Sequence, residues 1–154
     1  VRKIKLEICH PEVALELTER MLAFVIRFPQ FLAEFRGALD AVFASDPHAP
    51  LYNVIVSGYA TGSAVDSQSG APEASTQAVQ RLRFLGDREF GEWTVDVARG
   101  ELASCIRLHR LSRNKQEQRA IAERFQHAGP DDIVTLTQRF NELNRERNEL
   151  DALP

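Results

Sequence analysis

The stretch from Asp131 to Leu150, DDIVTLTQRFNELNRERNEL, carries the clearest structural signal in the chain. Its large apolar side chains recur at alternating steps of three and four residues, at Ile133, Leu136, Phe140, Leu143 and Leu150. Arg147 interrupts this series. Such spacing places one apolar stripe along a helix, as in a coiled coil. The sequence therefore predicts a helix from about Asp132 to Leu150, with Asp131 as its N-cap.

The residues before this stretch predict a second helix that folds back on it. Gly129-Pro130 is a turn signal, and a long helical pattern precedes it, from about Glu92 to Gln126. The first half of that pattern is apolar on more than one side, whereas residues 110–123 are nearly all polar. A helix that leaves a core and then turns back at Gly129-Pro130 predicts a C-terminal helical hairpin.

Folding the two arms about this turn predicts which residues face each other. In order from the turn, the pairs are Phe125 with Ile133, Ala122 with Leu136, Gln118 with Phe140, Lys115 with Leu143, Leu111 with Arg147, and Leu108 with Leu150. Phe140 and Leu143 thus face polar residues and gain only part of the roughly 1.5–3 kcal/mol that full burial provides. Two interpretations stay open: the aliphatic stems of Lys115 and Arg119 cover them, or a partner protein buries them on docking.

The hairpin residues that we expect to contact a partner protein lie along the stripe or beside it. They are Ile133, Leu136, Phe140, Leu143, Asn144, Arg147 and Leu150.

Upstream of the hairpin, apolar residues at helical spacing predict a bundle. One helix starts at Pro11 and stops before Pro29, and another runs from Glu73 until Gly86 ends it. Residues 51–59 are expected to form a short helix despite their β-branched residues, and residues 61–72 a flexible loop. Residues 1–9 alternate as a strand would, or form an extended or helical lead-in. The predicted fold is all-α, with a bundle over residues 1–108, a long helix, and a hairpin over residues 109–154.

Composition narrows the class of protein. The chain has 154 residues, a net charge of −3 and a pI of about 5.8, which argues against a strongly basic surface for nucleic acid. Its two cysteines are far apart in sequence, so we expect reduced thiols in a cytoplasmic protein. No apolar run approaches the ~20 residues that span a bilayer, and we expect no membrane partner.

Motifs of catalysis are absent from the sequence. Gly58-Tyr-Ala-Thr-Gly62 lacks the lysine and spacing of a phosphate-binding loop, and neither a Gly-x-Ser-x-Gly elbow nor a Cys-x-x-Cys pair occurs. We therefore expect no catalytic residue, no metal site and no cofactor in this domain. A Cys₂His₂ zinc site is an alternative that would need Cys9, His10, Cys105 and His109. A weak, salt-dependent contact with DNA would use Arg110, Arg113, Lys115 and Arg119.

Three stretches together resemble a known family. They are Leu22 to Leu32 (LAFVIRFPQFL), the long helix from Trp93 through Leu111 into the charged arm, and Phe140 to Leu150 (FNELNRERNEL). In this order they resemble the C-terminal helicase-interaction domain of bacterial DNA primase; residues 61–72 have no counterpart there. The resemblance implies a bundle followed by a hairpin that docks onto the N-terminal domain of the replicative helicase. It also implies that priming, the DNA-directed RNA polymerase activity, belongs to other domains of the parent protein.

Other assignments remain as alternatives. The chain could be the N-terminal helical domain of a replicative helicase or of a helicase loader, or an enzyme with a metal site in a helical bundle. A dimer that exchanges hairpins is a further alternative, because the long helix could stay straight through a hinge near Leu111.

Overall fold

A computed structural model describes residues 15–61 and 73–153. These residues form seven helices and no strand, which confirms the all-α prediction. The helices are α2 (Leu17–Arg27), α3 (Phe31–Glu34), α4 (Arg36–Phe43), α5 (Ala49–Thr61), α6 (Glu73–Phe90), α7 (Val95–Phe125) and α8 (Pro130–Ala152). The chain divides into two compact units, Val1–Ile106 and Arg107–Pro154, and α7 contributes to both.

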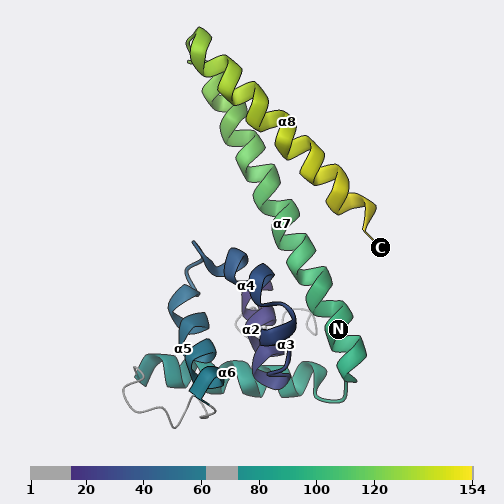
Figure 1. Cartoon of the computed structure of the whole chain (residues 1–154). Coiled ribbons are helices and arrows are strands. Elements are labelled where there is room, and N and C mark those ends of the chain that lie inside the picture. The colour runs from purple at the N-terminus through teal and green to yellow at the C-terminus, as the bar shows by residue number, and fades with distance from the viewer. Residues whose placement is uncertain (1–14, 62–72, 154) are drawn as a thin grey trace, which may run out of the picture. The chain divides into compact units, whose positions relative to one another are not determined.

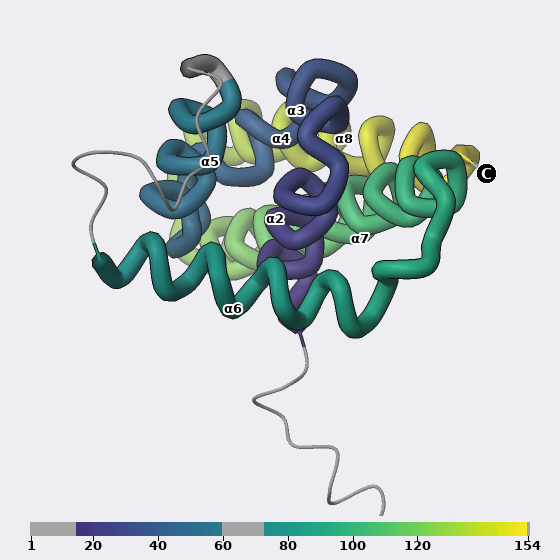
Figure 2. The backbone as a smooth tube through the Cα atoms, turned by 90° about the horizontal axis from the view of Figure 1, so that it is seen from below, coloured from purple at the N-terminus to yellow at the C-terminus, as the bar shows by residue number. Residues whose placement is uncertain are grey.

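The first unit is built around the crossing of α2 and α6 (Figure 2). Every residue of α2 from Met21 to Val25 is buried, because its apolar residues meet both α6 and the helices that follow α2. The ring of Phe24 stacks on that of Phe90 with centroids 4.3 Å apart. Burial of such large rings is the main stabilising contribution that a small helical unit can make.

Gly86 lies inside α6 and does not end it, so the predicted helix end at this residue is wrong. The helix continues to Phe90. A Cβ atom at Gly86 would lie 3.2 Å from the ring of Phe90 and 3.4 Å from the Cβ of Ala23. The glycine is needed because two helices and an aromatic ring approach closely at this point.

The N-terminus of α2 also differs from the prediction of a helix that starts at Pro11. Leu15 and Glu16 are not helical, and Glu16 is the N-cap of α2. Its backbone N–H donates to Oε1 of Glu19 at 3.2 Å, which satisfies one of the free donors at the start of the helix. Residues 11–14, the lead-in of residues 1–9 and residues 62–72 of the expected loop lie outside the described residues. Thr61 is the last residue of α5.

Polar contacts hold the shorter helices in place. The guanidinium of Arg99 donates to both carboxylate oxygens of Glu34, at 2.7 and 3.0 Å, and so joins α7 to α3. The hydroxyl of Tyr52 donates to Asp40 at 2.7 Å, which joins α5 to α4. The prediction of a helix over residues 51–59 is confirmed, and Leu51, Tyr52 and Ile55 form its buried side.

None of the helices in the described part of the chain combines the length and the apolar character needed to cross a membrane.

Candidate functional site: the C-terminal helical hairpin

The second unit consists of α8 and the part of α7 that begins at Arg107, which run antiparallel to each other (Figure 1). Gly129 is the N-cap of α8 and Pro130 its first residue, so the prediction of Asp131 as the cap is wrong. Pro130 fits there because the first turn of a helix has no partner for its N–H groups. Asp131 and Asp132 lie in that turn, where the helix dipole favours negative charge.

The apolar stripe of α8 is largely sealed inside this unit. Leu136, Leu143 and Leu150 are all buried. Leu136 and Leu143 form a cluster with Ile121 of α7, and Phe125, Ala128 and Phe140 pack against it in half-buried positions. The helical spacing was therefore a sound guide to which side of α8 faces α7.

The predicted register of the two arms is wrong by about one residue. Leu136 packs with Ile121 where Ala122 was expected, and Asn114 replaces Lys115 as the neighbour of Leu143. The side-chain nitrogen of Asn114 donates to the carbonyl oxygen of Leu143 at 2.8 Å. The prediction assumed a symmetrical turn, but α7 ends at Phe125 and α8 begins at Pro130, so the connection of residues 126–129 shifts one arm along the other.

In this register Leu143 is buried within the hairpin, whereas the predicted register had it facing the polar Lys115. The exposed fraction of Leu143 is 1%. Phe140 is half-buried against the same cluster and does not lie open either. Both side chains turn toward α7 because their neighbours there include Ile121 and the buried side chain of Asn114, which is 3% exposed.

The seven expected contact residues consequently fall into three groups. Leu136, Leu143 and Leu150 are buried, Phe140 and Asn144 are half-buried, and Ile133 and Arg147 are exposed. Sequence reasoning missed Val134, the most exposed large apolar residue of the hairpin at 58%. The sequence does show that Val134 is next to Ile133 and off the apolar stripe. This position could have indicated an exposed apolar side chain. The assignment of these residues to partner binding stays a prediction.

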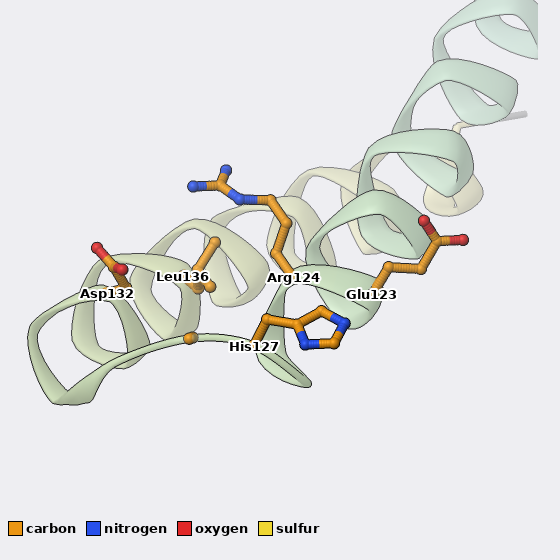
Figure 3. A pocket seen from close by; sticks show the side chains of 6 residues that line it. Glu123, Arg124, His127, Asp132 and Leu136 are labelled. Carbon is orange, nitrogen blue, oxygen red and sulfur yellow. The ribbon is translucent and has the colours of Figure 1, made fainter.

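A pocket of about 340 Å³ lies at the turn end of the hairpin. Glu123, Arg124, His127 and Ala128 contribute from the end of α7 and the turn, and Asp132 and Leu136 from α8. Leu136 lies between Asp132 and Arg124 (Figure 3). An apolar floor surrounded by charged groups of both signs suits an apolar side chain presented by another protein.

Ion pairs hold one side of the hairpin together. Arg139 of α8 donates to both carboxylate oxygens of Glu117, at 2.7 and 2.9 Å, and reaches Glu142 at 3.2 Å. Arg110 reaches Glu146 at 3.3 Å. The hydrogen bonds from Arg139 lower the pKa of the Glu117 carboxyl below its usual 4.5 and raise the pKa of Arg139.

The described residues hold no cluster of three or more His, Cys, Asp or Glu side chains that could bind a metal ion. Cys105 is buried, and desolvation raises the pKa of its thiol. Cys9 and His10, which the zinc alternative needs, lie outside the described residues.

Comparisons of the chain with models of protein families, with curated proteins and with solved structures find no match.

Proposed function

We propose that this chain is the helicase-interaction domain of a DNA primase, and that the turn end of its hairpin binds the N-terminal domain of the replicative helicase. The partner comes from the resemblance of its three helical stretches to that family. The binding surface comes from one observation: Ile133 and Val134 are 43% and 58% exposed at the end of the hairpin that holds the pocket.

The burial of the apolar stripe of α8 supports a binding surface at the turn end. Because Leu136, Leu143 and Ile121 are buried against each other, the two arms form a firm pair before any partner arrives. A surface that is already ordered loses less conformational entropy on binding. Ile133 and Val134 stay exposed at the turn, where a partner can reach both arms at once, and Leu108 and Leu153 are exposed at the other end of the hairpin.

The chemistry of the turn end also fits a protein partner. Protein interfaces commonly have an apolar centre with a polar rim. Here Ile133 and Val134 supply the apolar contact, while Arg124 and Asp132 supply charged groups and His127 a polar group near it. An apolar side chain from the partner could enter the pocket above Leu136, while other parts of the partner contact Ile133 and, on the outer side of α8, Val134.

Co-elution of the 154-residue chain with the purified N-terminal domain of the helicase tests the proposal. We expect a complex that elutes ahead of either protein alone. Separate elution at micromolar concentration would contradict it. Assembly of the chain by itself into rings, measured by analytical ultracentrifugation, would instead favour the helicase domain among the alternatives.

A further inference from the structure

The central part of the hairpin, defined as residues 114–122 of α7 and 139–148 of α8, has two chemically different sides. Its three carboxylates are Glu117, Glu142 and Glu146. All three are engaged in ion pairs, the first two with Arg139 and the third with Arg110. We call the side that carries these pairs the ion-pair side.

The other side carries amides instead of carboxylates. Gln118 donates to the side-chain oxygen of Asn144 at 2.8 Å, and Arg147 donates to the side-chain oxygen of Gln118 at 3.4 Å. These three side chains converge from both arms, and we call this the amide side.

Lys115 and Arg119 lie on the amide side by helical geometry. Lys115 is three residues before Gln118 and four before Arg119, which places the three along one flank of α7. Glu117, two residues after Lys115, is turned from it by about 200° around the helix. Lys115 and Arg119 are exposed and form no ion pair with any residue in the described ranges 15–61 and 73–153.

We propose that the amide side of the hairpin binds single-stranded nucleic acid. Lys115, Arg119 and Arg147 would contact phosphates, because none of the three is held in an ion pair within the described residues. Asn144 and Gln118 present both donors and acceptors, which suit the edges of unpaired bases. Phe140, half-buried four residues before Asn144, adds an aromatic edge to the same side.

The same side fits an acidic peptide less well. Carboxylates need donors only, so they cannot use the lone pair that the oxygens of Asn144 and Gln118 each keep beyond the bonds from Gln118 and Arg147. Bases use both kinds of group. The sequence suggests four basic residues for a DNA contact, and they do not all lie on one side of the hairpin. Lys115 and Arg119 lie on the amide side, whereas Arg110 is paired with Glu146.

Arg113 provides a matched control. It lies four residues before Glu117 and therefore on the ion-pair side, and its positive charge helps to lower the pKa of Glu117. Like Lys115 and Arg119 it is exposed. Reversing its charge changes the net charge of the chain by the same amount.

Fluorescence anisotropy with a labelled oligothymidylate of roughly 16 nucleotides, titrated with the whole chain at low salt, tests this proposal. The wild-type chain should bind, with affinity that falls as salt rises. Lys115→Glu and Arg119→Glu should each lower the salt slope by about 0.7, and together weaken binding roughly tenfold. Arg113→Glu should change neither value, and circular dichroism should show unchanged helix content in every variant.

Three results would overturn the proposal. They are absence of binding by the wild-type chain at low salt, an equal loss with Arg113→Glu, and competition by polyglutamate as effective as that by unlabelled oligonucleotide. The second would mean that binding follows overall charge, and the third that the side accepts acidic proteins. Because the proposal does not depend on the helicase, failure of helicase binding leaves it unaffected.

Discussion

The side-chain nitrogen of Asn114 in α7 donates a hydrogen bond of 2.8 Å to the backbone carbonyl oxygen of Leu143 in α8. Asn114 is 3% exposed, and its side-chain oxygen has no hydrogen-bond partner among the described residues. A buried polar group in a helical seam costs stability but favours one register over others. This contact therefore explains why the two arms meet with Ile121, and not Ala122, beside Leu136.

Asn114→Leu should stabilise the chain while weakening the preference for this register. Leucine removes the unpaired oxygen and adds apolar contact, so we expect a gain of about 1 kcal/mol in the free energy of unfolding. Chemical denaturation followed by circular dichroism measures it. Asn141→Leu, at an exposed position of α8, is the control and should change little. A loss of stability in Asn114→Leu would mean that the hydrogen bond outweighs the buried oxygen.

Leu143→Ala should destabilise the hairpin by about 2–5 kcal/mol, because it leaves a cavity in the cluster that Leu143 forms with Ile121 and Leu136. Amide hydrogen exchange of α8 reports this loss directly. Leu153→Ala removes a leucine that is 52% exposed and should leave exchange nearly unchanged. Equal protection in both variants would show that Leu143 is not buried in solution.

Gly86→Ala and Gly100→Ala should have effects of opposite sign. At Gly86 the new methyl group would crowd the ring of Phe90 and Ala23, so we expect a loss of about 1–3 kcal/mol. Gly100 lies in α7, where a methyl group would meet nothing within 4 Å, so alanine should add about 0.5–1 kcal/mol. Thermal denaturation of the two variants checks the signs; a gain from Gly86→Ala would contradict the close approach of α2 and α6.

The ion pair between Glu117 and Arg139 predicts a pH effect. Hydrogen bonds from Arg139 hold the pKa of Glu117 below its usual 4.5. The charged carboxylate therefore adds stability that is present above about pH 4.5 and is lost as the pH falls through the lowered value. Titration of the Glu117 side chain by NMR should show this pKa, and Arg139→Gln should raise it. An unchanged pKa in Arg139→Gln would show that the pair does not persist in solution.

The helices could be read from the sequence, but their packing could not. Steps of three and four residues identified the buried side of α8. The apolar first half of α7 predicted a helix surrounded by protein, but this part of α7 is buried on one side only, and Val97 is 52% exposed. The register depended on the length of the connection between Phe125 and Pro130 and on the burial of Asn114, which is usually a surface residue. Gly86 resembled a helix end because local sequence does not show that another helix crosses there. The expected pairing of Leu143 with Lys115, which left Leu143 only partly covered, was wrong as a result of the register alone.

We propose that the hairpin docks through the exposed apolar residues at its turn. A calorimetric titration of the whole chain with the helicase N-terminal domain, comparing Val134→Asp with Val97→Asp, tests it most directly. Both valines are more than half exposed, at 58% and 52%, but Val97 lies in the first unit. We expect Val134→Asp to weaken binding at least about tenfold, which is about 1.4 kcal/mol, and Val97→Asp to bind as the wild type does. Wild-type affinity in Val134→Asp would contradict docking through the turn.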